Sequence, residues 1–451
     1  FIEEHKGDIS RDEKKKLKNI SLRKQKMFLT IVLFINFGIL AVLKYTNMFI
    51  VTFTTFNTVD FVLPMGISFY TFQSTGYMID VYRGVADAEK NPFRYALFVS
   101  FFPQLVQGPI SRWNDLKKSL LESHAFSWIN IQYGFERILW GYFKKMVIAD
   151  RAAIGLATIQ SDVSVYYGAY AFVGMLLYAI DLYADFTGGI DITIGVAQMF
   201  GITLPENFRR PFFSKSIAEY WRRWHISLGD WLKNYLFYPL LRTKFFMNLP
   251  KKLKGKLGKK GAKQATTFLA MLILWFTIGY WHGGAWTFII GCGLLHWFYI
   301  VSGKLMEPLF VKWRAFFHIE KEKKGFILFQ RVRTFFLVMI GLVFFRSATV
   351  PDALRVLGRG VSGVGLQLFR DGVLSGLGLD WTELMILAVS ILFSAWVTIH
   401  NQKEDMRVTL EKKPIWLRWI ALYALLFYVI LLGKYGPGYS ASEFIYQNFK
   451  V

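Results

Sequence analysis

The stretch IGYWHGGAW, residues 278–286, places His282 among tryptophans and glycines inside a long apolar segment. No charged residue lies between Lys263 and Lys304. A titratable ring is costly in such surroundings unless it has a function. Imidazole titrates near neutrality, so His282 can take a proton from a hydroxyl at working pH. If the acyl donor is already activated, no serine or cysteine nucleophile is needed, and the residues permit acyl transfer in a membrane cavity.

The neighbours of His282 suit such a site. Trp281 and Trp286 are expected to limit water, and the glycines are expected to let a substrate approach the backbone. The apolar run 264–303 is too long for one membrane span and suits two, with Gly283-Gly284 as the turn. Lysines on both flanks predict that both ends lie in the cytoplasm. His282 would then lie ~27 Å along the first helix, in the outer half of the bilayer.

A second histidine, His225, lies in a predicted amphipathic helix over 217–236. Ser216 followed by Glu219 forms a capping box that starts this helix. Its apolar and charged faces are typical of an interfacial helix, with tryptophan and arginine at the headgroup level. Taken alone, His225 fits an interfacial side chain as well as a chemical one. His225 and Asp230 also match the H-x4-D pattern of soluble glycerolipid acyltransferases, but on a continuous helix they point ~140° apart, which makes the match accidental.

The other candidates for chemistry are less informative. His296 faces apolar residues on the return helix and is interpreted as structural or as supporting the site from behind its lining, while the remaining histidines lie in or beside polar segments. Asp181, Asp185 and Asp191 are able to bind a cation or relay protons, or else to pair with Lys and Arg inside a helical bundle. The sequence contains no GxSxG elbow, phosphate-binding loop, GxGxxG or HExxH motif. We therefore predict no metal site. The histidines beside polar segments are His5, His124, His318 and His400.

The composition indicates an all-α polytopic membrane protein. The chain has 451 residues, of which 54% are hydrophobic, and several windows approach the ~20 apolar residues that span a bilayer. The net charge of +23 is clustered in segments next to apolar runs, as in cytoplasmic loops, so nucleic-acid binding is rejected. The one cysteine, Cys292, excludes an internal disulfide.

We expect about nine to eleven membrane segments, several of them broken. A basic cytoplasmic segment, 1–26, precedes a transmembrane domain over 27–433 with its core motifs at about 60–350, and 434–451 forms a C-terminal tail. Further helices upstream of residue 1 are expected to be missing. A basic loop is predicted at 242–263 and an external loop at 347–380. The predicted segments are 27–45, 61–79, a broken or re-entrant 95–110, 134–149, 166–200, two within 264–303, 326–345, 381–399 and 415–433.

Six stretches together resemble the membrane-bound O-acyltransferase (MBOAT) family, in particular its bacterial branch that O-acetylates alginate, peptidoglycan and other surface polysaccharides. A relative that D-alanylates teichoic acid is near. The matching stretches run in the family's order and are LPMGISFYTFQSTGYMIDVYRG (63–84), FFPQLVQGPISR (101–112), GYFKKMVIADR (141–151), DFTGGIDITIGVAQMFGITLPENFRRPF (185–212), YWRRWHISLGDWLKNYLFYPL (220–240) and GYWHGGAW (279–286).

The resemblance implies a helical bundle with broken or re-entrant helices and an interfacial amphipathic helix. It implies that His282 is the principal catalytic histidine and that His225 is the second motif histidine. Asn207 and Arg210 would fix the approach to helix 217–236. The residues expected to line the reaction tunnel are Trp221, Arg223, Trp224 and Trp281.

The resemblance also implies the partners. An acetyl donor would come from the cytosol as acetyl-CoA, with no bound cofactor, whereas a carrier-protein thioester is the donor in the teichoic-acid branch. A separate extracytoplasmic protein would place the acetyl group on a glycan hydroxyl, and the chain would lie in the bacterial plasma membrane.

Three alternatives remain open. The first is a D-alanyl transferase that uses a carrier protein. The second is a transporter that uses Asp181, Asp185 and Asp191 as a proton or ion path. The third is a scaffold that only anchors an extracellular partner.

Overall fold

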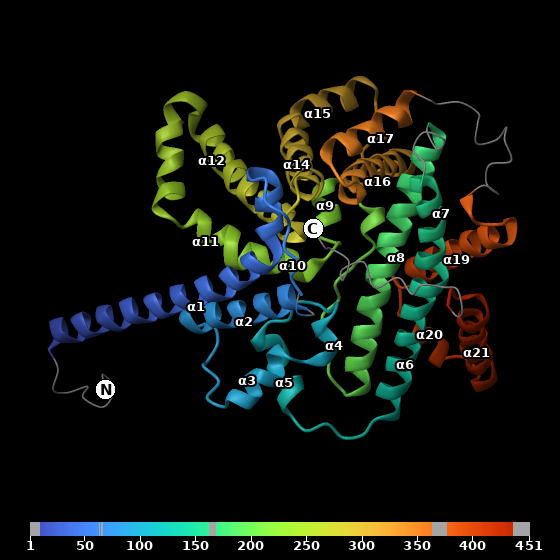
Figure 1. The fold of residues 1–451 in the computed structure, drawn as a ribbon, viewed down its shortest axis with the longest axis horizontal. Coiled ribbons are helices and arrows are strands. Elements are labelled where there is room, and N and C mark those ends of the chain that lie inside the picture. The colour runs from blue at the N-terminus through green and yellow to red at the C-terminus, as the bar shows by residue number, and fades with distance from the viewer. Residues whose placement is uncertain (1–9, 63, 65, 162–167, 363–376, 436–451) are drawn as a thin grey trace. The chain divides into compact units, whose positions relative to one another are not determined.

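The computed structural model describes residues 10–62, 64, 66–161, 168–362 and 377–435, and every element in them is helical (Figure 1). The predicted all-α architecture is therefore confirmed for these residues. Most of the predicted C-terminal tail and His5 lie outside them.

Seven of the described helices are long and apolar enough to cross a membrane, fewer than the nine to eleven segments expected. The predicted segments 61–79 and 95–110 do not yield helices of spanning length. The first is the 16-residue α2, and the second divides into the short α3 and α4, as a broken segment would. The seven candidates are Arg11–Phe53, Ala169–Met199, Lys244–Gly283, Trp286–Leu305, Lys324–Arg346, Trp381–His400 and Ile415–Leu432.

The chain packs as two units, and the first comprises the described parts of Phe1–Leu105 and Ile110–Glu122. Buried glutamines hold its broken stretch, because Gln73 Nε2 donates to Gln104 Oε1 (3.3 Å) and Gln104 Nε2 donates to Ser111 Oγ (2.6 Å). Its helices are α1 (Arg11–Phe53), α2 (Ile67–Tyr82), α3 (Pro92–Val99), α4 (Phe102–Leu105) and α5 (Trp113–Leu121).

The second unit comprises Val106–Pro109 and the described parts of Ser123–Val451, and it contains both motif histidines. Three π-helical segments (η1, η3 and η4) and one 3₁₀ turn (η2) interrupt its α-helices. Its elements are α6 (Trp128–Tyr142), η1 (Phe143–Ala149), α7 (Asp150–Ser161), α8 (Ala169–Met199), η2 (Pro211–Phe213), α9 (Ile217–Trp221), α10 (Ile226–Leu232), η3 (Lys233–Phe237), α11 (Tyr238–Leu241), α12 (Lys244–Gly283), α13 (Trp286–Phe288), η4 (Ile289–Leu294), α14 (Leu295–Leu305), α15 (Glu307–Phe316), α16 (Lys324–Arg346), α17 (Val350–Ser362), α19 (Trp381–His400), α20 (Met406–Glu411) and α21 (Ile415–Leu432).

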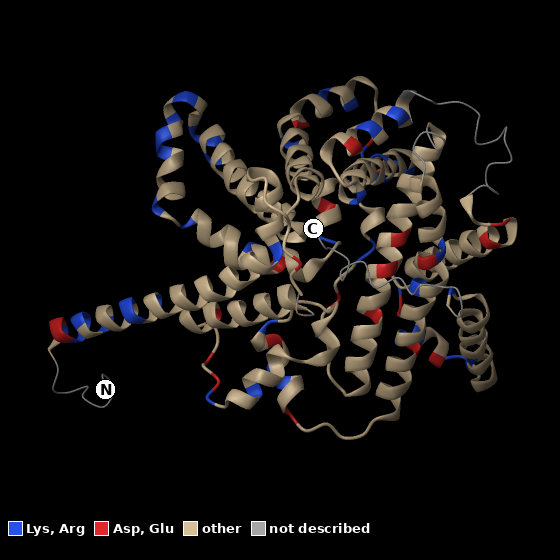
Figure 2. Cartoon of the chain, viewed as in Figure 1, with Lys and Arg blue, Asp and Glu red and all other residues tan. Residues whose placement is uncertain are grey.

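Two predicted loops contain helices instead. Residues 244–263 of the basic stretch form the first half of α12, which bends where Gly258 adopts φ 66° and ψ 172°. Figure 2 shows its lysines along this half of the helix. Lysine favours helix intrinsically, and an exposed helix lets the charges stay solvated. In the predicted external loop, Val350–Ser362 forms α17, and 363–376 lies outside the described residues.

Helices α6 and α8 pack antiparallel along a seam of paired glycines. A Cβ on Gly134 would lie 2.6 Å from the carbonyl oxygen of Gly195, and one on Gly141 would lie 2.6 Å from that of Gly188. The two pairs are seven residues apart on each helix, so they lie on one face. Small residues let helix backbones approach closely in an apolar medium, where dispersion and polar contacts replace the hydrophobic effect.

Ion pairs border this seam. Arg137 contacts Asp191 (2.9 Å) and Glu206 (2.7 Å), and Lys144 also contacts Asp191. Lys145 contacts Asp185 (2.6 Å) and Asp150 (3.0 Å). Buried charges are tolerated when they are paired in this way, so the charges fix the register of α6, η1 and α8.

Substituting Gly141 with alanine tests the seam. The added methyl group meets a backbone carbonyl that cannot move independently, so we expect a loss of about 1–3 kcal/mol in the free energy of unfolding. The measurement is the thermal midpoint of the protein purified in detergent. Gly303→Ala is the matched control, because Gly303 lies in α14 and no described atom comes within 4 Å of the position that its methyl group would take. Equal midpoints for the two variants would contradict the close packing.

Candidate active site

The predicted continuous helix over 217–236 is broken at the histidine. Helix α9 ends at Trp221 and α10 begins at Ile226, with His225 between them in the left-handed conformation (φ 46°, ψ 55°). The start at Ser216 is as predicted, since Ser216 Oγ accepts from the N–H of Glu219 (3.2 Å). The predicted continuity was wrong, but the predicted faces are confirmed, because none of the charged residues is buried and most of the apolar face is. Its buried residues are Ile217, Tyr220, Trp224, Leu228, Trp231, Leu232 and Tyr235.

The break is held by the loop that precedes it. The N–H of Arg209 donates to the carbonyl of Arg223 (2.9 Å), and the N–H of Ile226 donates to the carbonyl of Asn207 (3.0 Å). Asn207 Oδ1 also accepts from the backbone N–H (3.0 Å) and the hydroxyl (2.9 Å) of Ser227. The loop therefore supplies backbone partners that a continuous helix would have supplied itself.

Asn207 also orients His225. Its Oδ1 is occupied by the two Ser227 donors, so its Nδ2–H donates to His225 Nδ1, at 3.3 Å. In the neutral ring this assignment leaves the proton on Nε2. His225 is 1% exposed, and burial lowers its pKa to about 3. The imidazole therefore stays neutral across the physiological range.

A cavity lies against the other motif histidine. His282, on the last turn of α12, is 4% exposed and contacts the rings of Trp281 (4.9 Å) and Phe345 (5.2 Å between centroids). Helices α8, α9, α12, α14 and α16 contribute to the walls together with η4. The lining residues are Leu182, Phe186, Tyr220, Trp221, Trp224, His282, Gly291, Cys292, His296, Val338, Gly341, Leu342 and Phe345.

His296 lines the same cavity directly, whereas the sequence predicted a residue that is structural or supports the site from behind its lining. Its ring packs against Trp221 (5.2 Å) and Trp275 (6.0 Å), and its Nδ1 has no hydrogen-bond partner among the described residues. His296 is ten residues beyond Trp286, where the return helix begins, and so lies ~15 Å from the turn. The sequence signal for His296 was a single histidine in an apolar return segment. The direction in which its side chain points depends on tertiary packing, which that signal does not contain.

The tryptophans near the motif histidines lie in different places relative to the cavity. Trp221 and Trp224, which are predicted to line a reaction tunnel, line this cavity. Trp281 lies between the two motif histidines, with ring centroids 6.1 Å from His225 and 4.9 Å from His282. Trp286 is 46% exposed and is not among the lining residues of the cavity, so its expected part in limiting water stays a prediction.

The glycines around His282 serve the protein's own packing. Gly284 has φ 64° and caps α12, which confirms the predicted turn. A Cβ on Gly279 would lie 2.6 Å from Cα of Ile289, and one on Gly283 would collide with the ring of Phe288. The space that was expected to admit a substrate is therefore filled by the return helix.

The predicted site residues Arg223 and Arg210 do not line the cavity. Arg223 pairs with Glu219 and donates to the carbonyl of Arg210 (3.4 Å). Arg210 adopts a left-handed conformation (φ 52°) just before η2. Both arginines therefore lie among the residues that surround α9, outside the cavity lining. Asp230 pairs with Lys233 (2.6 Å), so it does not orient His225.

Two of the three aspartates on α8 are neutralised. Asp185 pairs with Lys145, and Asp191 pairs with Arg137 and Lys144. Asp181 is buried and forms no ion pair in the described part of the chain. Two of the three carboxylates that the transporter alternative needs are therefore engaged in structural ion pairs.

Gln107 is a further buried residue that sequence reasoning missed. Its Nε2 donates to the carbonyl of Phe186 (3.3 Å), and its own carbonyl accepts from the Thr193 hydroxyl (3.3 Å). Phe186 both lines the cavity and packs edge-on against His225 (5.0 Å). Gln107 therefore holds the part of α8 that separates the cavity from His225.

Comparison with known sequences decides the family. The sequence model of the membrane-bound O-acyltransferase family matches residues 85–349. The chain belongs to this family. The matched region includes both motif histidines and every lining residue of the cavity.

Individual relatives carry more specific names. The chain is 34% identical to the probable alginate O-acetylase AlgI of Pseudomonas syringae over 76% of its length and 60% of the relative's. It is 31% identical to the peptidoglycan O-acetyltransferase of Helicobacter pylori over 76% of its length and 66% of the relative's. The teichoic acid D-alanyltransferase of Bacillus subtilis is 28% identical over 62% of this chain and 68% of the relative. The chain thus spans less than two thirds of the P. syringae relative.

Replacing Asn207 tests the joint at His225, that is, the hydrogen bonds from Asn207 that hold the break between α9 and α10. Asn207→Ala removes the acceptor of two Ser227 donors, one of them a backbone N–H, so we expect a loss of about 1–3 kcal/mol in the free energy of unfolding. The thermal midpoint in detergent measures it. Asn248→Ala is the control, since Asn248 is exposed on α12 and its midpoint should stay within error of the parent. A midpoint for Asn207→Ala equal to that of the control would show that the joint does not stabilise the fold.

Proposed function

We propose that this multi-pass membrane protein is an O-acetyltransferase of the bacterial plasma membrane. It takes an acetyl group from a cytosolic donor, acetyl-CoA, and passes it across the membrane for O-acetylation of a cell-surface polysaccharide. The observation that carries the proposal is His282 in an aromatic, largely apolar cavity within the family-matched region. The acetyl-transferring relatives, which are more similar than the D-alanyl-transferring one, favour acetyl as the group transferred.

His282 serves as the general base. Its neutral imidazole accepts the proton of the acceptor hydroxyl while the oxygen attacks the thioester carbonyl. The new C–O bond forms, the C–S bond breaks, and the imidazolium returns its proton to the leaving thiolate. Exclusion of water from the cavity protects the thioester from hydrolysis and strengthens each polar contact.

Two further residues, Trp221 and His225, support this step. Trp221 lines the cavity, and its Nε1–H has no hydrogen-bond acceptor within the described ranges. A buried donor without a partner is costly, so this N–H is suited to receive the carbonyl oxygen as it gains charge. His225 lies behind the lining and acts as a positioning residue, since its ring meets Trp281, which in turn meets His282.

The partners follow from the direction of transfer. The lysines of the first half of α12 mark the donor side of the membrane, in keeping with the excess of basic residues in cytoplasmic segments. A separate extracytoplasmic protein receives the acetyl group and places it on the polymer.

An assay of donor use tests the proposal. Membranes that contain the protein are given acetyl-CoA labelled in the acetyl group or, in parallel, a carrier protein loaded with labelled D-alanine. We expect label from acetyl-CoA to reach membrane-associated acceptors and His282→Ala to lower the rate by about 100-fold to 10,000-fold, the range of general-base catalysis. His318→Ala is the control, because His318 is exposed and remote in the chain from the matched motifs. Transfer from the loaded carrier alone would replace the proposal with D-alanyl transfer.

A further inference from the structure

Two arginines of the second unit have guanidinium groups that form no hydrogen bond or ion pair in the described part of the chain. Arg210 directly precedes η2, and Arg331 lies on α16 with its guanidinium over the ring of Phe213 (5.7 Å to the centroid). The Nε atom of Arg331 is buried. A guanidinium that stacks on a ring keeps its in-plane N–H groups for an anion.

The surroundings of these arginines lack a compensating carboxylate. Glu219 is the only acidic residue of the segment 207–229, and it pairs with Arg223. Helix α16 contains no acidic residue. Burial lowers the pKa of Arg210, and the neighbouring charges of Arg223 and Arg331 lower this pKa further. The positive charges therefore lie close enough to repel one another, and a bound anion would relieve that repulsion.

The backbone holds Arg210 in a conformation that does not suit a residue with a side chain. Its φ is 52°, in the left-handed region, which costs about 1–2 kcal/mol for any residue except glycine. No hydrogen bond or ring contact of its side chain within the described residues explains an arginine at this position. A cation is thus kept here at a conformational cost, as is common at binding sites.

Arg331 shares a face of α16 with the wall of the histidine cavity. The lining residues Val338, Leu342 and Phe345 follow it at the spacing that places side chains on one side of a helix. The ring of Phe345 contacts His282 (5.2 Å between centroids). The distance from Arg331 to Phe345 is ~21 Å along the helix axis. This face therefore leads from the arginines to the proposed catalytic histidine.

The arginine end of this face is on the donor side of the membrane. Helix α16 begins at Lys324, directly after Lys321 and Lys323, and such a basic excess is typical of cytoplasmic segments. The rings of Phe212 and Phe335 meet between the arginines and the cavity (4.9 Å between centroids). A molecule that passes along this face must part these rings, which favours a slender chain over a sugar.

We propose that Arg210 and Arg331 bind the phosphate groups of the acyl donor, at the end of its phosphopantetheine arm. The phosphate oxygens accept hydrogen bonds from the two guanidinium groups. The arm extends along α16 toward His282, a distance similar to the length of an extended pantetheine chain. Coenzyme A and a carrier protein both present this arm, so the proposal concerns the chemistry that the two donors share. It rests on the acyl transfer proposed above and adds the site that holds the charge of the donor.

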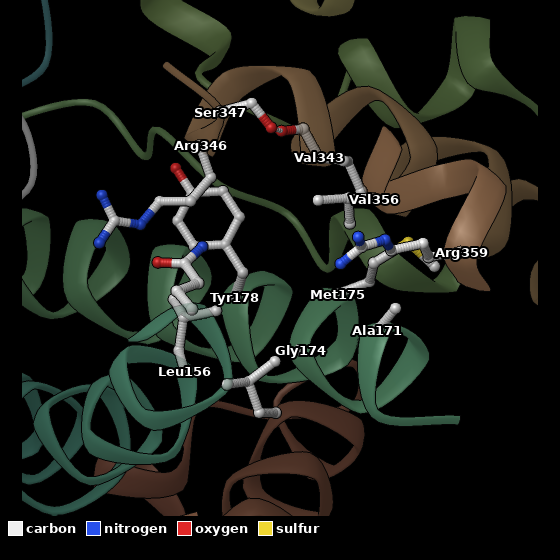
Figure 3. A pocket seen from close by; sticks show the side chains of 12 residues that line it. Leu156, Ala171, Gly174, Met175, Tyr178, Val343, Arg346, Ser347, Val356 and Arg359 are labelled. Carbon is white, nitrogen blue, oxygen red and sulfur yellow. Dashed lines mark hydrogen bonds between the residues drawn. The ribbon is translucent and has the colours of Figure 1, made fainter. Parts of the chain in front are cut away.

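Arg346 provides a matched control. It is the last residue of α16, at the opposite end of the helix from Arg331, and it is exposed and forms no ion pair in the described part of the chain. Figure 3 shows it beside Tyr178 in a second cavity, to which α7, α8, α16 and α17 contribute and which no histidine lines. Arg346→Gln therefore removes an equal charge from the same helix without changing the proposed site.

Equilibrium binding of coenzyme A to the purified full chain in detergent tests the proposal. We expect Arg210→Gly and Arg331→Gln each to weaken binding roughly tenfold or more, since each removes charge-assisted hydrogen bonds to phosphate. Glycine adopts the left-handed conformation without strain, so Arg210→Gly should fold as the parent does, which an unchanged thermal midpoint checks. Arg346→Gln should bind coenzyme A as the parent does.

Several outcomes would overturn the proposal. Parental affinity in both Arg210→Gly and Arg331→Gln would do so, and an equal loss in Arg346→Gln would make the effect one of net charge. Displacement of coenzyme A by inorganic phosphate at a similar concentration would assign the arginines to a free anion, and displacement by phosphatidylglycerol would assign them to a lipid.

Two further outcomes separate this site from the proposed function. If coenzyme A does not bind to the parent but a phosphopantetheine-bearing carrier protein does, and the two arginine variants weaken that binding, the site stands and acetyl-CoA is not the donor. If the parent and both variants transfer labelled acetyl from acetyl-CoA with the same KM, the proposed function stands and the site is wrong. Failure of both donors to bind to the parent would contradict both.

Discussion

The hydrogen-bonded joint between Asn207 and the break at His225 is the constraint on which the candidate site depends. A turn inside an apolar unit leaves backbone groups that water cannot satisfy, and the loop before η2 supplies their partners. With those groups satisfied, α9 and α10 can diverge, which directs Trp221 and Trp224 into the cavity and places His225 behind Trp281. The joint therefore sets both the shape of one cavity wall and the tautomer of the buried imidazole.

Ion pairs and paired glycines fix the position of α8 against its neighbouring helices. The glycines bring the backbones of α6 and α8 together, and the ion pairs of Asp185 and Asp191 fix their register. The cavity side of the same helix carries Leu182 and Phe186 instead. Separation of structural charges on one face from an apolar, histidine-containing cavity on the other favours chemistry at His282 over passage of ions along α8.

Much of this arrangement could be predicted from the sequence because local rules govern it. The long apolar runs, the glycine turn after His282 and the cap at Ser216 depend on composition and on neighbours a few residues away. The break at His225 could not, because Trp221 to Leu232 is compatible with a continuous helix and the competing hydrogen bonds come from Asn207, 18 residues earlier in the chain. The cavity position of His296 and the exposure of Trp286 likewise arise from the packing of α9, η4 and α16, which no local pattern encodes.

The most direct test of the central claim is the O-acetyl content of surface polymer in cells whose only copy of the protein carries His282→Ala, with the amount of protein in the membrane measured in the same cells. We predict that the acetyl content falls to that of cells lacking the protein while its membrane level is unchanged. Wild-type acetyl content in those cells would contradict a catalytic role and make His282 a packing residue.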